Sequence, residues 1–397
     1  MRGNIGRLLL GNGLGQVIQF SAILIFSRIY TPIDFGILGQ VQSYATIMAI
    51  VCTLQMHLSI PLSKTDHDAR AVVSIIVAIA LLAVICSLPL ALYFGSIYAF
   101  AVGMAALVGL SNTYNSYLVY SGRFAKISKF YIFRSIAIVS MQITLGYAQV
   151  NNGLIWGAVA GEAITAFYLA RTAGAGIVQM KFWRIGDIVH QVLDKRDFAV
   201  FGTLQEIISV SAFYAPLFLF AHYFGNDVAG QYAMASRLIW APVILFTGSF
   251  AQVLYHDFGK KANSLLSFDM LIFPHPAYYC CLLLIPLMFF LLNDVAVILL
   301  GSQWTLAADL LPLVVLWGCI FIVSTPWRVL CRMTRKQRVH LIIDAGMLLG
   351  IAAVFYIRPD SPLHTMLLIV GIVAVQNILM FITAFYSVKA SLLEAAT

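Results

Sequence analysis

Charged side chains are scarce in this chain of 397 residues: Asp, Glu, Lys and Arg make up 10% of it, whereas hydrophobic residues make up 61%. The mean hydropathy is +0.91. Soluble domains carry about 25% charged residues, so this balance excludes an ordinary water-soluble protein. The alternating apolar and polar segments of a membrane β-barrel are missing too, and Ala71 to Leu92 is apolar on every face. We therefore expect an all-α integral membrane protein.

Motifs of several enzyme classes are also missing. No glycine-rich loop precedes a lysine, so nothing indicates ATP hydrolysis. The six cysteines lack metal-ligand spacing and the eight histidines are scattered, so we expect no metal site and no other cofactor. No gap on the expected outer side is long enough for a catalytic domain. A membrane protein that is not an enzyme fits these absences best.

Apolar runs of about 20 residues, the length with which a helix crosses a bilayer, occur twelve times. They are 5–27, 36–60, 71–94, 97–119, 130–149, 153–171, 198–222, 228–252, 268–292, 304–325, 341–357 and 363–386. The first run begins almost at Met1 and contains Asn12, Gln16 and Gln19, which is not the plain apolar core of a cleavable signal peptide. We therefore expect about twelve transmembrane helices.

The widest polar connection divides these spans into two sets of six. We expect an N-terminal six-helix bundle over 1–175, a cytoplasmic linker over 176–197 and a C-terminal six-helix bundle over 198–397. A short repeat supports this division, because Tyr30–Gly36 and Tyr223–Gly230 share an aromatic residue, an Asp and a Gly that lead into a helix. Paired halves are common in transporters.

Basic residues indicate the orientation of the chain, since Lys and Arg near span ends are retained in the cytoplasm. Of the 24 basic residues, 21 lie in or near alternate gaps. They are Arg2, Arg7, Lys64, Arg70, Arg123, Lys126, Lys129, Arg134, Arg171, Lys181, Arg184, Lys195, Arg196, Lys260, Lys261, Arg328, Arg332, Arg335, Lys336, Arg338 and Lys389. We expect both termini to be cytoplasmic. The net charge of +8 then reflects topology and contact with anionic lipids, not nucleic-acid binding.

Polar residues spaced three or four apart occur in three of the expected spans, which places them on one face of each helix. The stripes are Asn12, Gly15, Gln16 and Gln19; Gln40, Ser43 and Tyr44; and Asn112, Asn115 and Ser116. Inside a bilayer such side chains face other helices or a water-filled cavity. Each stripe alone could be a set of interhelical hydrogen bonds, whereas together they favour a polar lumen.

Four charged residues away from the expected cytoplasmic ends are candidates for function. Glu162, Glu206 and Arg237 are each eight or nine residues inside a span, near the expected midplane, and Arg28 lies at the outer mouth of the first. Charges at such depth cost about 2.5 to 3.5 kcal/mol each on insertion scales. Glu206 and Arg237 could form a structural ion pair. Alternatively, the arginines attract an anionic substrate and a buried carboxylate binds and releases a proton.

Two other acidic residues are expected to have structural and not functional roles. Asp269 and Asp344 lie within a turn of expected cytoplasmic span ends, where capping or snorkelling accounts for them. The histidines are assigned to the membrane interface. Arg358, the last basic residue outside the cytoplasmic set, is expected to be an ordinary loop residue.

Several segments resemble bacterial polysaccharide exporters, the Wzx-type flippases of O-antigen and capsule repeat units in the multidrug/oligosaccharidyl-lipid/polysaccharide (MOP) superfamily. The resemblance covers nearly the whole chain. Its segments are Gly15–Phe20, Arg28–Gly36, Phe198–Phe201, Tyr223–Gly225, Gly230–Ala233, Arg237, Pro242 and Gly301–Trp304.

The resemblance implies two six-helix bundles around a central cavity in the bacterial cytoplasmic membrane. Such a protein moves undecaprenyl-diphosphate-linked oligosaccharides from the cytoplasmic to the periplasmic leaflet by alternating access, and a cation gradient drives many members. On this interpretation the cavity residues are Arg28, Arg237, Asn12, Gln16, Gln19, Gln40 and Asn112, and the cation-coupling residues are Glu162 and Glu206. The partners implied are this lipid-linked substrate, membrane lipids, and the polymerase and chain-length regulator of the same pathway.

Two alternatives remain. A drug or small-cation exporter of the same superfamily (MATE-like) would favour acidic and aromatic cavity groups, and Arg237 argues against it. A multispan polysaccharide polymerase or ligase would present a large periplasmic loop, which this chain lacks.

Overall fold

The chain is helical throughout the described part. The computed structural model describes residues 2–394, except 175, 180–183, 262–292, 334–336 and 358. Every regular element in those ranges is a helix, which confirms the expected all-α class. The chain divides into two compact units, Met1–Ser211 (unit 1) and Ala212–Thr397 (unit 2).

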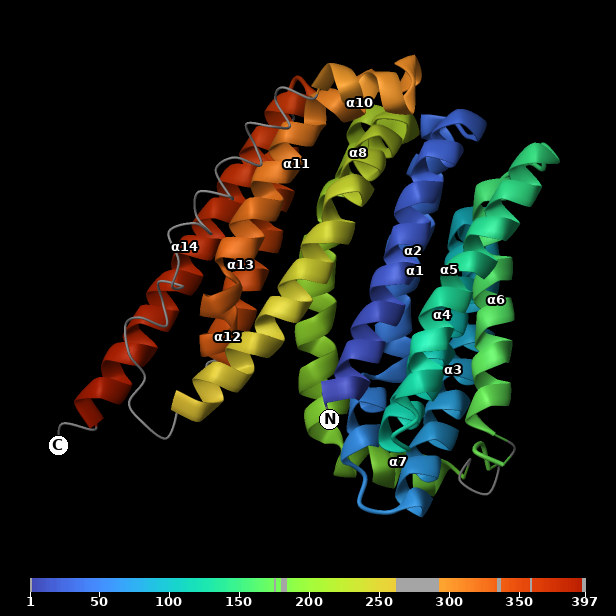
Figure 1. The fold of residues 1–397 in the computed structure, drawn as a ribbon, viewed down its shortest axis with the longest axis vertical. Coiled ribbons are helices and arrows are strands. Elements are labelled where there is room, and N and C mark those ends of the chain that lie inside the picture. Colours follow the sequence, from blue (N-terminus) through green and yellow to red (C-terminus); the bar gives the residue numbers. More distant parts are fainter. Residues whose placement is uncertain are drawn as a thin grey trace. The chain divides into compact units, whose positions relative to one another are not determined.

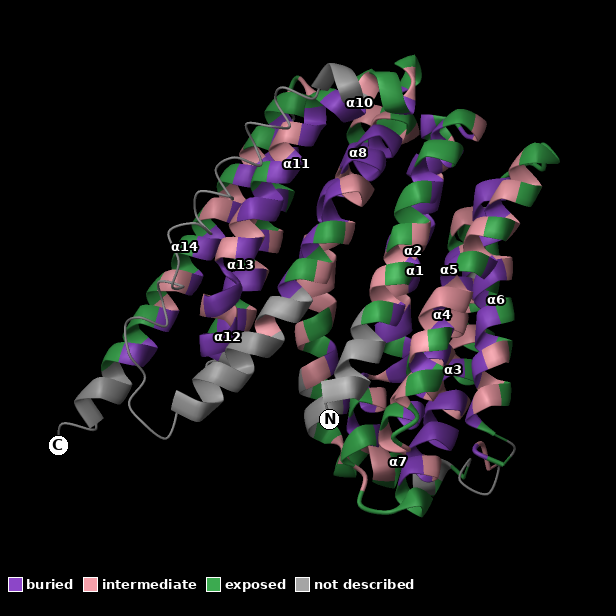
Figure 2. Cartoon of the chain, in the orientation of Figure 1, coloured by how far each residue is buried: buried purple, intermediate pink, exposed green. Residues whose placement is uncertain are grey.

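Unit 1 contains six long helices that lie side by side (Figure 1). These are α1 (Arg2–Ile29), α2 (Pro32–Thr53), α3 (Asp66–Phe94), α4 (Ser96–Tyr120), α5 (Phe124–Tyr147) and α6 (Gly153–Ala173). Shorter elements are the 3-10 helix η1 (Met56–Leu62), α7 (Ile185–Asp194) and the π-helix η3 (Asp197–Gly202). Large apolar side chains such as Leu82 and Ile85 of α3 are exposed, and exposed and buried residues alternate along the helices (Figure 2). Lipid solvates such faces.

Thr31 and Asp34 fix the turn between α1 and α2. Thr31 is the N-cap of α2, with Pro32 in its first turn. The backbone N–H of Thr31 donates to Asp34 Oδ2 over 2.9 Å, and the backbone N–H of Asp34 donates to Thr31 Oγ1 over 3.4 Å. This reciprocal capping box satisfies donors that a helix start leaves open. The Tyr30–Gly36 segment of the sequence repeat therefore has a structural role.

Helix α2 is shorter than the sequence predicts. We expected a span over 36–60, but α2 ends at Thr53, because Leu54 and Gln55 adopt left-handed backbone conformations with φ of 45° and 50°. Such conformations stop a right-handed helix. The chain continues as η1, and the apolar run over 36–60 therefore did not indicate where the helix ends.

Helix α8 (Thr203–Lys261) begins in unit 1 and continues in unit 2. Gly225, with φ 88° and ψ 171°, breaks it in the second copy of the repeat, a conformation that glycine adopts without strain. The other elements of unit 2 are α10 (Asn293–Leu300), the 3-10 helix η5 (Ser302–Trp304), α11 (Thr305–Val323), α12 (Thr325–Met333), α13 (Gln337–Tyr356) and α14 (Pro362–Glu394).

Ten helices of the described chain are long and apolar enough to cross a membrane. One of them, Thr203–Thr247, contains the Gly225 break and corresponds to the two expected spans 198–222 and 228–252. The expected span 268–292 lies outside the described residues. The structure thus agrees with a multi-pass membrane protein of about twelve helices.

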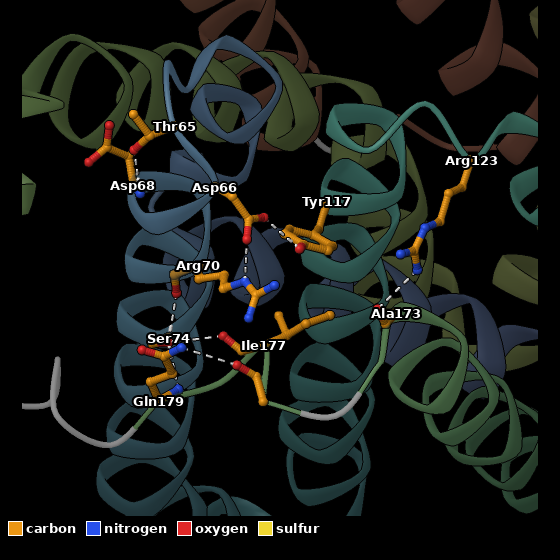
Figure 3. Close-up of polar contacts among 11 residues, drawn as sticks. Thr65, Asp66, Asp68, Arg70, Ser74, Tyr117, Arg123, Ala173, Ile177 and Gln179 are labelled. Atoms are coloured by element: carbon orange, nitrogen blue, oxygen red, sulfur yellow. Dashed lines mark hydrogen bonds and ion pairs between the residues drawn. The ribbon is translucent and has the colours of Figure 1, made fainter.

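Hydrogen bonds fasten the chain after α6 to α3, and the end of α6 to the residue before α5 (Figure 3). The backbone N–H of Gln179 donates to Ser74 Oγ over 2.9 Å, and Ser74 Oγ lies 3.4 Å from the Ile177 carbonyl. Arg123 Nη1 donates to the carbonyl of Ala173 over 3.2 Å. The first residues of the expected linker 176–197 therefore pack on unit 1.

Candidate functional site

Glycines bring three helices of unit 1 into close contact, with α5 between α1 and α6. A Cβ added to Gly15 of α1 would lie 2.9 Å from the backbone oxygen of Tyr131, and one added to Gly161 of α6 would lie 2.6 Å from the Cα of Ile138. In each helix a second close-packed glycine lies four residues earlier. Small residues at this spacing let membrane helices approach closely.

At the centre of this three-helix contact, Arg134 of α5 forms an ion pair with Glu162 of α6. Arg134 Nε lies 3.0 Å from Glu162 Oε1 and 3.1 Å from Oε2, and Arg134 Nη2 also donates to Oε1. The two residues lie ten and nine positions after their helix starts, which is about 14 to 15 Å of helix rise. The pair is therefore near the middle of a bilayer core of about 30 Å.

The two charged groups of this pair differ in exposure. The Glu162 side chain is 1% exposed, whereas that of Arg134 is 35% exposed. Within the described part of the chain, Arg134 Nη1 has no hydrogen-bond partner. Arg134 can therefore bind a second anion at this depth while Glu162 holds its other nitrogen atoms.

Neutral polar side chains surround the pair. Gln19 Nε2 of α1 donates to Ser135 Oγ over 3.2 Å. Asn115 Nδ2 of α4 donates to the Tyr131 hydroxyl oxygen over 3.3 Å. Tyr131 and Ser135 lie one turn before and directly after Arg134 on α5. We call Gln16, Gln19, Asn115, Tyr131, Arg134, Ser135 and Glu162 the polar layer of unit 1.

Two amide oxygens of the polar layer are buried without a hydrogen bond from the described residues: Gln16 Oε1 and Asn115 Oδ1. Buried polar atoms are nearly always hydrogen-bonded to protein or to ordered water. These oxygens are therefore places where water or the hydroxyl groups of a ligand would bind.

Three of the residues expected from sequence, Gln16, Gln19 and Glu162, belong to the polar layer. Asn12 is half-buried one turn before Gln16, and Asn112 is exposed one turn before Asn115. Their roles in binding remain predictions.

The other expected residues lie outside the polar layer. Gln40 donates to the Gly36 carbonyl of its own helix over 3.2 Å, and Arg28 is exposed in the last turn of α1. Glu206 is exposed in the part of α8 that belongs to unit 1, and Arg237 is half-buried in the part that belongs to unit 2. Their roles also remain predictions.

Sequence reasoning missed Arg134. We assigned it to a cytoplasmic span end because the fifth span was expected over 130–149, but α5 begins at Phe124. The basic residues of its first two turns, Lys126 and Lys129, made that part look like a loop. The turn at Gly122, with φ 67°, was a signal that the helix starts earlier.

No protein-family model matches the chain, and no curated protein matches it. Solved structures do match. A multidrug resistance MATE family transporter of the MOP superfamily in its inward-facing conformation has 14% identity over 96% of this chain and 95% of that chain, with a TM-score of 0.62. An outward-facing conformation has 14% identity over 98% and 94%, with a TM-score of 0.59.

A third match is a MOP superfamily transporter from Pyrococcus furiosus, with 13% identity over 98% of this chain and 96% of that chain and a TM-score of 0.52. At this identity the likeness shows the fold alone. The chain has the fold of the MATE transporters of the MOP superfamily.

Proposed function

We propose that this protein is a flippase that moves undecaprenyl-diphosphate-linked oligosaccharide repeat units from the cytoplasmic to the periplasmic leaflet by alternating access. The proposal joins the sequence resemblance to Wzx-type exporters with the fold of the MOP transporters. The substrate needs such a protein, because neither a diphosphate nor its sugars cross hydrocarbon unaided.

The observation that carries this proposal is Arg134 near the middle of the bilayer. Its side chain is one-third exposed, and its guanidinium keeps the Nη1 donors besides those that bind Glu162. Arg is suited to phosphate oxygens because its planar fork of donors binds them in pairs. The polar layer also supplies amides and hydroxyls, such as Gln19 and Asn115, that match sugar hydroxyls.

The pair also suggests how an ion could be coupled to transport. Glu162 and a substrate diphosphate compete for the same guanidinium. A proton on Glu162 would remove the negative charge that holds Arg134 and leave more of its donors for the substrate. In this scheme Glu162 is the cation-coupling residue, and Arg134 is the group through which its protonation affects substrate binding.

The second candidate function is a MATE-like drug or small-cation exporter. The observations in its favour are the multidrug resistance transporters among the matching structures and the buried carboxylate of Glu162. However, Glu162 is already neutralised by Arg134, so the polar layer offers a cationic drug no net negative charge. Likewise, the matching Pyrococcus furiosus transporter has a binding pocket of reverse polarity that suggests a different function for that protein.

A reconstituted transport assay separates the two candidates. Proteoliposomes would contain the purified protein and a fluorescent polyprenyl-diphosphate-linked oligosaccharide, and an impermeant reductant would report the label left in the outer leaflet. Parallel vesicles would be tested with ethidium, an organic cation. We expect lipid translocation and no ethidium transport. Ethidium transport without lipid translocation would contradict the flippase proposal and favour the drug exporter.

Arg134 is tested in the same assay. R134Q should slow translocation roughly 10- to 150-fold, since a hydrogen bond to a charged group contributes about 1.5 to 3 kcal/mol, and R134K should retain part of the rate. The matched control is R171Q. Arg171 also lies on α6, but in its last turn, where it contacts the ring of Phe167 and not the polar layer. Equal rates for R134Q and R171Q would remove Arg134 from the substrate site.

A further inference from the structure

A row of polar side chains in unit 2 runs from α12 across α14 to α13. Arg328 Nη2 donates to Asn377 Oδ1 over 3.1 Å. Asn377 Nδ2 lies 3.3 Å from Gln376 Oε1, and Gln376 Nε2 donates to Asp344 Oδ1 over 2.7 Å. At the end of the row, Asp344 Oδ2 lies 3.5 Å from His340 Nε2, one turn earlier on α13.

This row is buried in unit 2. His340, Asp344 and Gln376 are each 5% exposed, and Asn377 is 2% exposed. Sequence reasoning assigned Asp344 to capping or snorkelling, which is wrong for a buried side chain that accepts a hydrogen bond from Gln376 of α14. The assignment of His340 to the membrane interface stays a prediction. Asp344 lies six residues inside the candidate span Arg338–Tyr356, about 9 Å along the helix.

The row has a direction. Each amide donates toward Asp344 and accepts from the Arg328 side, so the positive guanidinium and the carboxylate terminate one polarised chain. Hydrogen bonds in such chains strengthen one another in a low-dielectric interior. A change of charge at Asp344 therefore alters the bond of every member of the row.

We propose that His340 and Asp344 bind one exchangeable proton, and that the row transmits its charge to Arg328. Histidine changes charge between about pH 5 and 8, and the Asp344 carboxylate lies 3.5 Å from the ring nitrogen of His340, on the side where a proton would be held.

Other titratable and charged side chains of the described residues lie on the same three helices. Of the described side chains, α12 contributes Arg328 and Cys331, whose Sγ lies 4.0 Å from the Met380 carbonyl, and α14 contributes neutral amides. Arg338 on α13 and Lys389 on α14 are exposed. Arg328 is the charged group that the row joins to this pair by hydrogen bonds.

Arg328 also contacts the residues at the junction of α11 and α12. Its Nε donates to Ser324 Oγ over 3.2 Å, and its guanidinium lies 4.4 Å from the centre of the Phe321 ring. Ser324 separates α11 from α12. Protonation of the His340–Asp344 pair would thus change the charge at the end of a row that reaches the residue between α11 and α12.

The proton is measured directly by NMR on the full-length protein in nanodiscs with isotope-labelled histidine. The His340 signal is assigned by its loss in H340Q. We expect this signal to titrate between about pH 5 and 8 and its midpoint to be displaced in D344N, which is isosteric and retains an amide oxygen for Gln376. H364Q is the matched control, because His364 is exposed at the start of α14.

The proposal fails if the His340 signal does not respond to pH, or if it titrates identically in the wild-type protein and D344N. Q376M supplies a second test that leaves the His340–Asp344 pair intact. It should displace the same midpoint, because it cuts the row between Asp344 and Arg328. A midpoint unchanged in Q376M would overturn the transmission to Arg328.

The role of this proton in transport rests on the proposed function, whereas its binding does not. In the translocation assay with a pH gradient, D344N should lower gradient-driven translocation roughly tenfold, within the usual range of coupling between sites. Titration of His340 in a protein that moves no lipid would refute the flippase and keep the proton site. Translocation with unaltered gradient dependence in D344N would keep the flippase and remove this proton from its coupling.

Discussion

Arg134 and Glu162 form an ion pair near the middle of the membrane, with Arg134 Nε within 3.1 Å of both carboxylate oxygens. The pair joins α5 to α6 beside the close contact of Gly161 with Ile138. Removing one partner of a buried pair leaves an uncompensated charge, whereas removing both is often neutral. Single and double variants of this pair can therefore distinguish the effect of Arg134 on the stability of unit 1 from its proposed role in transport.

We expect R134Q to lower the thermal unfolding midpoint strongly, because Glu162 is 1% exposed and would lose the partner of its buried carboxyl group, and removing one partner of a buried pair costs about 3 to 5 kcal/mol. The double variant R134Q/E162Q should recover most of the stability and none of the transport. Thermal unfolding in detergent and the translocation assay measure the two effects. A double variant as unstable as R134Q would show that the amides pack poorly, and full transport in it would remove the pair from the mechanism.

The glycine contacts predict a second effect on stability. A Cβ on Gly161 would approach the Cα of Ile138 to 2.6 Å, so G161A must push α6 away from α5, and overpacking of this kind costs about 1 to 3 kcal/mol. Gly103 of α4 has no atom within 4 Å of an added Cβ. G103A should therefore be neutral or slightly stabilising, since Ala favours helix by up to about 1 kcal/mol. Equal unfolding midpoints for the two variants would contradict the close approach.

Much of the fold could be predicted from the sequence, because about 20 apolar residues are a physical requirement for each span. The polar stripe on α1 likewise indicated Gln19, which bonds Ser135. Span ends were harder. Arg134 and Arg328 were assigned to topology, because a basic residue near a span end looks the same whether it lies in water or binds a buried Glu162 or Asn377.

The pairing partners were beyond sequence reasoning for a related reason. Glu162 was identified by its depth alone, but its partner depends on the relative rotation of α5 and α6, which Gly157 and Gly161 determine through close packing. Asp344 was dismissed by its place near a helix end, and its burial depends on Gln376 of α14. Such contacts are tertiary properties that no single span contains.

His57 predicts a pH dependence of stability. It lies in η1, outside the candidate spans, and its Nδ1 atom is buried without a hydrogen-bond partner among the described residues. Burial lowers the pKa of His57 to about 4, whereas an unfolded histidine titrates near 6.5. Between these values only the unfolded chain binds the proton, so stability falls as the pH falls from about 6.5 to 4, by at most about 1.4 kcal/mol per pH unit.

The measurement is the thermal unfolding midpoint of wild-type protein and H57Q from about pH 7.5 to 4.5, a window that brackets the ordinary histidine pKa. The wild-type protein should lose stability on acidification more steeply than H57Q. H364Q, which alters an exposed histidine, should follow the wild-type curve. Parallel curves for wild-type protein and H57Q would show that His57 is protonated in the folded state.

Arg237 provides the remaining test of the flippase. It lies half-buried in α8, twelve residues after the Gly225 break, and we predicted from sequence that it contacts the diphosphate. R237A should abolish translocation at normal protein levels, and R237K should restore part of it, because a lysine supplies the charge without the paired donors of a guanidinium. R338A, which removes an exposed arginine at the start of α13, should translocate at the wild-type rate. Full activity of R237A would leave Arg134 as the substrate-binding arginine and remove Arg237 from the site.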